Sequence, residues 1–323
     1  MKLLSYKIDK IQVDQIGILH NQSIFNLNDC FNNNSLLEII QIKNYQEKIA
    51  NFISGKNCIK HDIDNITILP PVPKPNSFRD AYAFRQHVET ARRNRGAKML
   101  PEFDQFPVFY FSNHNNMYGH NQEIELMPDH FEQLDYELEI AILIGKRGRN
   151  ILSKNADKHI AGFFILNDLS ARKLQIEEMK LNLGPAKGKD FANVIGPYLV
   201  TSDELESKCV ETKFGKKYDL KMSAYLNGEL LSEGNAKDMN WTFGEIIERA
   251  SYGVDLFPGD IIGSGTVGTG CLLELNGSRK NIDGKKQWLK AGDEIELQIE
   301  GLGKITNKII KSKSKHSLLK IKK

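Results

Sequence analysis

The alternation of apolar and polar side chains predicts strands at the start of the chain. Lys2–Ile8 and Gln15–Leu27 alternate with a period of two residues, as half-buried strands do, and His20–Gln22 is predicted to be a hairpin turn within the second stretch. Pro70–Pro75 contains four prolines in six residues, which neither a helix nor a central strand can accommodate. We therefore expect an extended connector there, between a small N-terminal domain of residues 1–70 and a larger domain of residues 71–323.

A helical pattern follows these strands. Ser35 and Glu38 match the S-x-x-E capping box, in which each side chain accepts a hydrogen bond from a backbone N–H group at the start of a helix. Apolar residues then recur at helical spacing from Leu36 to Ile53, and Gly55 can end the helix. No cluster of catalytic residue types accompanies this helix, so we expect it to pack against the rest of the chain or to contact a second subunit.

Strands outnumber helices in the larger domain. Phe257–Asp260 and Ala291–Asp293 contain Gly-Asp turns that lead into alternating runs, and the strands follow no regular βαβ order. The sequence therefore predicts a β-rich α+β fold. All the residue groups with catalytic potential lie in this domain.

Two glutamates lie on one predicted strand, Leu134–Gly145. Residues two apart on a strand share a face and lie about 6.5–7 Å apart, so Glu137 and Glu139 project together. Ala141 and Leu143 follow on the same face, which indicates that the face is partly buried. Two neighbouring carboxylates repel each other unless a cation joins them, and a hard divalent ion with oxygen ligands would do so. The alternative is a solvated pair on an edge strand.

An aspartate ends the next apolar strand, Ile160–Asp168. A helix is predicted to follow from Leu169, which places Asp168 at the N-cap position, and capping is its simplest role. Asp168, Arg172 and Gln175 are spaced i, i+4 and i+7, so they would share one face of a helix. An acid, a cation and an amide in line at the end of a buried strand suggest the floor of a site.

A histidine and two acids form a second group. Asp80 and His87 are seven residues apart, so a helix over Phe78–His87 would turn both side chains the same way. A lone histidine is often structural. Glu274 lies among apolar neighbours, where its charge needs a partner, and His87 is available.

Two turn segments offer further polar groups. Gly184–Phe191 contains Lys189, although lysines in loops are usually solvated. Gly263–Gly270 matches G-x-G-x-x-G, but dinucleotide binding needs a helix after the glycines, and Cys271–Gly277 is predicted to be a short strand and a turn. We expect the glycine-rich backbone to approach a small ligand closely, with Thr266 donating a hydrogen bond.

Composition and charge add few constraints. The net charge of +3 is small, and we expect neither a nucleic-acid nor a membrane partner. The four cysteines form no CxxC pair and are predicted to be reduced thiols of a cytoplasmic protein. No apolar stretch is long enough to cross a bilayer or to form a secretory signal. A solvated tail or edge strand is predicted from the C-terminal lysines Lys308, Lys311, Lys313, Lys315, Lys320, Lys322 and Lys323.

Five of these segments together resemble the fumarylacetoacetate hydrolase family, from about Ser77 to the end of the chain. They occur in the family's order as DxYxxRQH at Asp80–His87, DYELEIA at Asp135–Ala141, NDLSARKLQ at Asn167–Gln175, GKDF at Gly188–Phe191 and GSGTVxxG…LEL at Gly263–Leu275. The resemblance implies a mixed β-sandwich roll, usually dimeric, here with a small N-terminal α+β unit.

The resemblance also implies a role for each candidate residue. One divalent cation, Mg²⁺ first and Ca²⁺ or Mn²⁺ as alternatives, would be bound by Asp80, Glu137, Glu139 and Asp168. His87 would be the general base, oriented by Glu274. Contact with the substrate or with a developing oxyanion is implied for Lys189, Arg172, Gln175 and Thr266, and for the tyrosines Tyr82 and Tyr110.

The implied activity is hydrolysis of a carbon–carbon bond in a small 1,3-dioxo acid such as fumarylacetoacetate, fumarylpyruvate or an acylpyruvate. Asp80 and His87 together favour this branch. The alternative is an oxaloacetate decarboxylase or an oxo-acid hydratase or isomerase that uses the same metal site. The short N-terminal unit and the distinct composition of residues 90–107 leave the substrate open.

Overall fold

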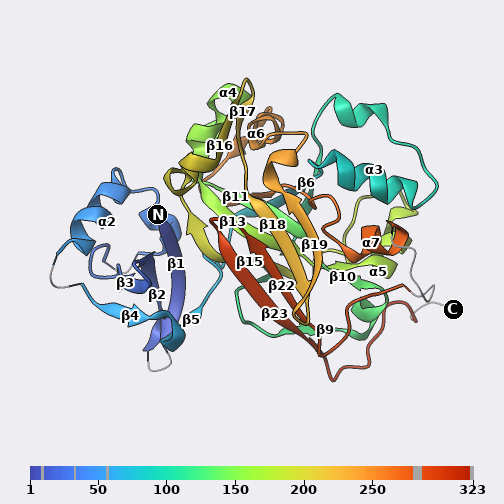
Figure 1. Cartoon of the computed structure of the whole chain (residues 1–323), viewed down its shortest axis with the longest axis horizontal. Helices are drawn as coiled ribbons and strands as arrows, with labels where there is room; N and C mark the ends of the chain where they lie inside the picture. The colour runs from blue at the N-terminus through green and yellow to red at the C-terminus, as the bar shows by residue number, and fades with distance from the viewer. Residues whose placement is uncertain (9–10, 33, 56–57, 279–285, 321–323) are drawn as a thin grey trace.

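The computed structural model describes residues 1–8, 11–32, 34–55, 58–278 and 286–320. Within these ranges the strands form two large sheets and three two-stranded ones, with short helices around them. Figure 1 shows a smaller lobe of N-terminal elements beside a larger lobe that contains the rest of the chain. The predicted β-rich α+β architecture is therefore confirmed.

The larger sheet has twelve strands in the described ranges and runs through both lobes. Its order is β4 (Lys60–Asp62), β3 (Ser23–Asn26), β2 (Ile11–His20), β1 (Lys2–Ile8), β15 (Asn193–Val200), β13 (Ile160–Asp168), β11 (Leu138–Ile144), β21 (Asp260–Gly263), β6 (Ser77–Ala81) and β7 (Phe109–Ser112), with β5 (Thr67–Ile68) beside β1 and β8 (Met117–Tyr118) beside β15. The sheet is mixed, because β21 with β6 and β15 with β8 are parallel pairs. β1 joins the lobes by pairing with β15, where Leu3 lies opposite Leu199.

A five-stranded sheet packs against the large sheet. The predicted Gly-Asp turns lead into strands of both sheets. Gly292, with a φ of +95°, makes the turn before β22, as predicted. The order of the smaller sheet is β19 (Glu229–Asn235), β18 (Lys221–Leu226), β22 (Glu294–Ile299), β23 (Gly303–Lys311) and β9 (Ile124–Leu126). The two-stranded sheets are β10 (Leu134–Asp135) with β14 (Ser170–Ala171), β12 (Gly148–Arg149) with β20 (Asp255–Leu256), and β16 (Cys209–Thr212) with β17 (Gly215–Tyr218).

The helices are short. The α-helices are α1 (Leu36–Ile39), α2 (Tyr45–Ile53), α3 (Arg85–Arg93), α4 (Ser153–Ala156), α5 (Arg172–Met179), α6 (Phe243–Ser251) and α7 (Leu272–Ser278). The 3₁₀ turns are η1 (Ile63–Asn65), η2 (Pro101–Asp104), η3 (Pro128–Phe131), η4 (Asp157–His159), η5 (Ser202–Lys208) and η6 (Ala236–Asp238). None of the described helices is long and apolar enough to pass through a membrane.

Strand β11 separates two hydrophobic cores. Its alternate residues, from Leu138 to Ile144, face the smaller sheet and share a core with Met222 and Leu297. Ala141 and Leu143 face the opposite side and belong to a second core that includes Ile39 of α1. Both faces of β11 are therefore buried, and each fully buried aliphatic side chain contributes about 1.5–3 kcal/mol to the free energy of unfolding.

The N-terminal lobe follows the predicted order of strands and then helix. The hairpin turn is confirmed, since β2 and β3 pair around Asn21 and Gln22. The capping box of Ser35 and Glu38 is also present. The prediction of one helix up to Gly55 is wrong, because Asn44 has a left-handed φ of +58°, which a continuous helix cannot include.

The proline segment packs closely between the lobes. Ser5 Oγ donates a hydrogen bond to Pro71 O at 2.9 Å, and Val72 is buried in the second core. Because β1 and β15 belong to one sheet, the two parts share backbone hydrogen bonds as well. The domain boundary at residue 70 stays a prediction.

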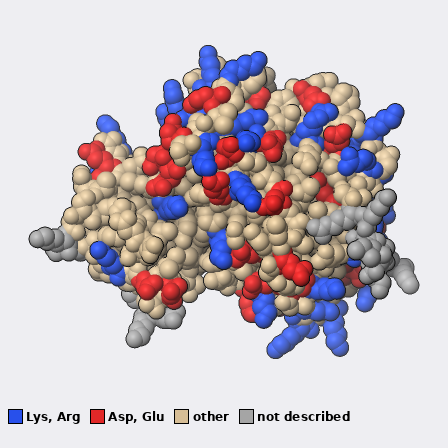
Figure 2. Space-filling view, viewed as in Figure 1, with Lys and Arg blue, Asp and Glu red and all other residues tan. Residues whose placement is uncertain are grey.

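The C-terminal lysines are solvated, as predicted, but their strand is not at an edge. β23 lies between β22 and β9, with Ile305 and Ile309 buried, and the lysines point outward. Figure 2 shows lysine and arginine side chains interspersed with acidic ones over much of this face. The exposed lysines of the run are Lys308, Lys311, Lys313, Lys315 and Lys320, and Lys322 and Lys323 lie outside the described residues.

Candidate functional site

Four carboxylates meet on one face of the large sheet. Asp80 lies in β6, Glu139 in β11 and Asp168 at the end of β13, while Glu137 directly precedes β11. One oxygen from each residue lies within 4.8 Å of the others, and each residue is at most 5% exposed. The structure thus brings together all four residues that the sequence singles out as metal ligands.

Strand register places these carboxylates, and a glycine makes room for them. In neighbouring strands Gly263 of β21 pairs with Asp80 of β6 and with Ala141 of β11. A Cβ atom on Gly263 would overlap Asp80 Oδ1 and would lie 3.1 Å from Glu139 Oε2. A side chain at this position would therefore fill the space between two of the acids.

Two helices near the site begin later than the sequence predicts. Residues 77–81 form β6 and α3 begins only at Arg85, so Asp80 and His87 do not share a helical face. Asp168 lies within β13, and Ala171 is the N-cap of α5, so Asp168 has no capping role. Of the three residues predicted to share a helical face, only Arg172 and Gln175 lie in α5. There Arg172 Nη1 donates a hydrogen bond to Gln175 Oε1 at 3.1 Å.

Lys189 neutralises one half of the carboxylate cluster. Its buried Nζ donates to Glu137 Oε2 and, at 2.5 Å, to Asp168 Oδ2. Burial alone would raise the pKa of Glu137, but the charges of Lys189 and Arg172 outweigh it and hold that pKa well below its ordinary value. Tyr110 OH also donates to Asp168 Oδ2, at 2.5 Å. A lysine in a polar loop, which the sequence alone leaves ambiguous, is therefore part of the site.

The other half of the cluster is formed by Asp80 and Glu139. Burial, followed by the negative charges nearby, raises the pKa of Asp80 to about 8 and the pKa of Glu139 well above its ordinary value. The Gly265 N–H donates to Glu139 Oε2 at 3.0 Å and to Asp80 Oδ1 at 3.2 Å, and Thr266 Oγ1 lies 3.4 Å from Glu139 Oε1.

The residues present fit a divalent cation. Asp168 Oδ1 is buried and has no hydrogen-bond partner among the described residues. Buried acceptors without partners are rare in proteins, and oxygen ligands at this spacing are those that a hard divalent ion binds. The four carboxylates therefore form a candidate metal centre, in which Asp168 Oδ1 is available as a ligand atom.

Asp135 supports the site and has no role in the sequence prediction. It accepts hydrogen bonds from Arg172 Nε at 2.9 Å and from the backbone N–H groups of Leu272 and Leu273 at the start of α7. Arg172 in turn donates to Glu137 Oε1 at 2.6 Å. The sequence does contain a signal, because Asp135, like Glu139, lies two residues from Glu137.

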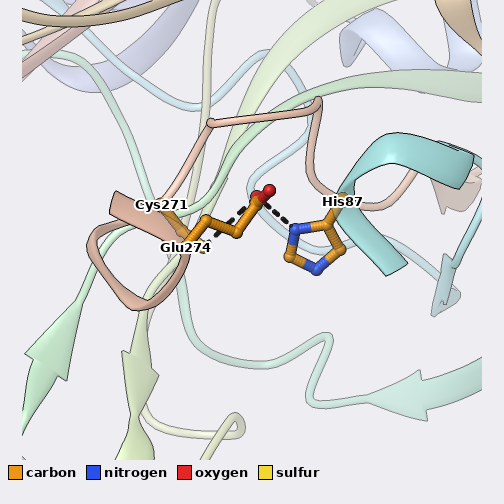
Figure 3. Close-up of side chains that lie close together, drawn as sticks. All are labelled: His87, Cys271 and Glu274. Carbon is orange, nitrogen blue, oxygen red and sulfur yellow. Dashed lines mark hydrogen bonds and ion pairs between the residues drawn. The ribbon is translucent and has the colours of Figure 1, made fainter. Parts of the chain in front are cut away.

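His87 and Glu274 form the predicted pair. Figure 3 shows the imidazole of His87, on α3, facing the carboxylate of Glu274, on α7, and Nδ1 lies 2.5 Å from Glu274 Oε1. Because an ionised carboxylate can only accept hydrogen bonds, Nδ1 carries the proton and Nε2 is left as the basic nitrogen. The Thr269 N–H also donates to Glu274, at 3.2 Å. The pair has the arrangement of a general base with its orienting acid.

The element that contains Glu274 differs from the prediction. Leu272–Ser278 is a helix and not a strand, so a helix does follow the glycines. Its first N–H groups bind the carboxylate of Asp135, and they therefore do not form the phosphate cradle of a dinucleotide-binding motif.

The remaining predicted residues surround these groups. The ring of Tyr82 lies edge-on to His87, with 5.5 Å between ring centroids, and also contacts Phe103 of η2. Gln175 lies against the lysine loop, since a Cβ on Gly188 would overlap its backbone. Phe109, next to Tyr110 on β7, lines a separate surface hollow together with Trp241 and Arg249; none of the site residues lines it.

Comparison with known proteins identifies the family. The family model described as fumarylacetoacetate (FAA) hydrolase C-terminal matches residues 76–310, and the chain belongs to this family. Oxaloacetate tautomerase YisK of Bacillus subtilis (strain 168) is 30% identical over 251 residues, which cover 77% of this chain and 75% of that protein.

Solved structures show the same fold. Fumarylacetoacetate hydrolase (EaFAH) from psychrophilic Exiguobacterium antarcticum has a TM-score of 0.73 at 25% identity, covering 97% of this chain and 100% of that one. Maleylpyruvate hydrolase from Sphingobium sp. SYK-6, in complex with manganese(II) ion and pyruvate, has a TM-score of 0.71 at 17% identity, with the same coverage. At 17% identity, the likeness to the maleylpyruvate hydrolase structure concerns the fold alone.

Proposed function

We propose that this protein is a divalent-metal-dependent hydrolase that cleaves a carbon–carbon bond in a small 1,3-dioxo acid. The observation that carries the proposal is the buried His87–Glu274 pair together with four convergent carboxylates, one of which, Glu137, feels the charge of His87. A base next to an ion site can activate water where an oxo acid is bound. We further propose that the protein is a homodimer that binds a small oxo-acid substrate and neither nucleic acid nor a membrane.

The proposed ligands of the ion are Asp80, Glu137, Glu139 and Asp168. Mg²⁺ is our first choice, with Mn²⁺ or Ca²⁺ as alternatives, because all three prefer oxygen ligands. The manganese in the maleylpyruvate hydrolase structure is consistent with this class of ion. When bound, the ion would supply Lewis-acid polarisation of the substrate's oxo groups.

His87 Nε2 would take a proton from water, and the resulting hydroxide would add to the carbonyl carbon. The imidazolium is stabilised by Glu274, whose carboxylate stays fixed by the Thr269 N–H. Positioned acid–base catalysis of this kind contributes about 10²–10⁴-fold to a rate. The buried position of both side chains strengthens their interaction.

The chain also supplies a cation for the oxyanion. Lys189 Nζ is the buried cation between Glu137 and Asp168, and a substrate oxyanion could share its protons. When the carbon–carbon bond breaks, its electron pair goes to the carbon beside the second oxo group, and the imidazolium of His87 returns the proton there. One water is consumed and two acids are formed. Arg172 holds Glu137 and Asp135, so we assign it mainly to positioning.

A second candidate is tautomerisation of oxaloacetate or a similar oxo acid. It is favoured by the relative from Bacillus subtilis, which is named an oxaloacetate tautomerase. This reaction moves one proton between carbon and oxygen and breaks no carbon–carbon bond. The same base and ion site would serve it, and no water would be activated.

The test follows the ultraviolet absorbance of acylpyruvates and fumarylpyruvate with purified protein, with and without EDTA. Cleavage that EDTA and His87→Ala both abolish would support the hydrolase. Conversion of enol to keto oxaloacetate, without cleavage of any dioxo acid, would assign the protein to the tautomerase branch. Cleavage that survives both treatments would refute the proposed site.

A further inference from the structure

A second group of side chains that could bind a metal ion includes the proposed general base, His87. His87, Cys271 and Glu274 each offer one ligand atom, and these atoms lie within 4.8 Å of one another. All three residues are buried, at 5%, 0% and 0% exposure. Figure 3 shows Cys271 and His87 on either side of the Glu274 carboxylate. Cys271 Sγ lies 3.6 Å from Glu274 Oε1, the same oxygen that His87 Nδ1 contacts.

The donor atoms differ in kind from those of the carboxylate cluster. The cluster offers oxygens alone, which suit Mg²⁺, Mn²⁺ and Ca²⁺. This second group offers one sulfur, one imidazole nitrogen and one carboxylate oxygen, a set that suits Zn²⁺ better than a hard ion such as Mg²⁺. Sites with three such protein ligands and an open fourth position are typical of zinc that can bind a further small ligand.

The spacing of the sulfur and the carboxylate oxygen fits a tetrahedral ion. With Zn–S of about 2.3 Å and Zn–O of about 2.1 Å, tetrahedral geometry places sulfur and oxygen about 3.6 Å apart. The Cys271 Sγ to Glu274 Oε1 distance is 3.6 Å. The distance from His87 Nδ1 to Glu274 Oε1, now 2.5 Å across a hydrogen bond, would widen to about 3.3 Å when the proton leaves.

The backbone holds the group in place. Asn94, at the end of α3, donates through Nδ2 to the carbonyl oxygen of Glu274 at 3.2 Å, so the helix of His87 is tied to the helix of Glu274. The Thr269 N–H holds the other carboxylate oxygen of Glu274, at 3.2 Å. The Cys271 thiol contacts Glu274, and the proposed catalytic steps leave that thiol unused.

We infer that His87, Cys271 and Glu274 form a second metal site, selective for Zn²⁺ or Co²⁺, and that an ion bound there inhibits the enzyme. Binding would release the proton of the Cys271 thiol and move the His87 proton from Nδ1 to Nε2. The thiolate and the carboxylate would then neutralise the two charges of the ion. With Nε2 protonated, His87 could no longer act as a base. The inhibitory part rests on the proposed function, whereas the binding part does not.

Cobalt absorption tests the binding part without any substrate. Co²⁺ is titrated into wild-type protein, Cys271→Ala and the matched control Cys209→Ala, each with excess Mg²⁺ to fill the carboxylate cluster. The wild type and Cys209→Ala should show a thiolate-to-cobalt charge-transfer band that saturates at one Co²⁺ per chain, and Cys271→Ala should lack it. No such band in the wild type, or an equal band in Cys271→Ala, would overturn the proposal.

Zinc inhibition tests the second part. With excess Mg²⁺, Zn²⁺ should abolish turnover by the wild type, and Cys271→Ala should require a Zn²⁺ concentration more than about tenfold higher. Equal zinc sensitivity in both proteins would refute inhibition through this site. If Cys271→Ala fails to fold by circular dichroism, Cys271→Ser replaces it in both tests. If no oxo acid is turned over, the proposed function fails and the cobalt titration alone decides the metal site.

Discussion

The carboxylate cluster and the His87–Glu274 pair belong to one site but are built differently. The carboxylates lie on or beside β6, β11 and β13, so the register of the large sheet fixes their spacing. His87 and Glu274 come from two helices, α3 and α7, that meet outside this sheet. The cluster is therefore part of the central core, whereas the pair depends on how two short helices dock.

The two groups also differ in how their charges are balanced. Glu274 is balanced by hydrogen bonds from His87 and Thr269, so the pair needs no ion. The four acids of the cluster are offset by the cations of Lys189 and Arg172, and Asp168 Oδ1 has no hydrogen-bond partner among the described residues. The comparison predicts that ion binding and base function are separable, so that a substitution in one group leaves the other intact.

The largest expected effect comes from removing the base. His87→Ala should lower kcat by about 10²–10⁴-fold, because positioned acid–base catalysis contributes that much, while ion binding persists. Steady-state turnover of the best dioxo acid measures it. His20→Ala, at an exposed hairpin in the N-terminal lobe, is the control and should leave kcat unchanged. A decrease in kcat of less than about tenfold in His87→Ala would contradict the proposal that His87 is the base.

The second effect is on stability and comes from removing the buried lysine. Lys189→Met leaves Glu137 and Asp168 buried without their cation, which should reduce the free energy of unfolding of the metal-free protein by about 3–5 kcal/mol. Saturating Mg²⁺ should recover part of the loss. Urea unfolding with and without Mg²⁺ measures both quantities.

Lys187 provides the matched control for that experiment. It lies two residues away, is exposed and pairs with Asp190 at the surface, so Lys187→Met should change the free energy of unfolding by less than about 1 kcal/mol. An equal loss in the two variants would show that the loop, and not the buried charge, is what matters.

The smallest effect concerns a buried carboxylate that needs no ion. Burial opposes the ionisation of Asp129, but hydrogen bonds from Ser317 Oγ and from the N–H groups of Leu318 and Leu319 outweigh it and lower the Asp129 pKa. Asp129→Asn should cost about 1–3 kcal/mol at neutral pH. Because the folded pKa is depressed, this contribution is present above the ordinary aspartate pKa and is lost as the pH falls through the folded value.

Unfolding curves of wild type and Asp129→Asn from pH 7 down to pH 3 check that dependence. The difference between the two proteins should stay constant near neutrality and shrink in acid. A difference that grows as the pH falls would contradict the assigned direction of the Asp129 pKa. Added Mg²⁺ should not change the difference, which separates Asp129 from the carboxylate cluster.

The sheet part of the site could be predicted from the sequence, and the helical part largely could not. Period-two alternation predicts that Glu137 and Glu139 project to the same side, and they do converge although β11 begins only at Leu138. By contrast, Asp80 was assigned to a helix and Glu274 to a strand, because segments of five to seven residues carry too little periodicity to distinguish the two. The role of Lys189 depends on contacts 21 and 52 residues away, which no local pattern encodes.

The resemblance of motifs supplied what periodicity did not. It placed Asp80 with the glutamates although Asp80 lies on a strand, and it agreed with the pairing of His87 and Glu274 that charge alone had suggested; both groupings are present in the structure. Asp135 was missed because the capping of α7 cannot be predicted for a segment that was assigned to a strand. Whether Arg172 and Gln175 contact the substrate stays a prediction.

A manganese titration monitored by electron paramagnetic resonance tests the central claim, that the ion and the base are held separately. Wild-type protein and His87→Ala should each bind one Mn²⁺ per chain with the same affinity, and Asp168→Asn should bind it more than about tenfold more weakly. Loss of Mn²⁺ binding in His87→Ala, or full affinity in Asp168→Asn, would contradict the account.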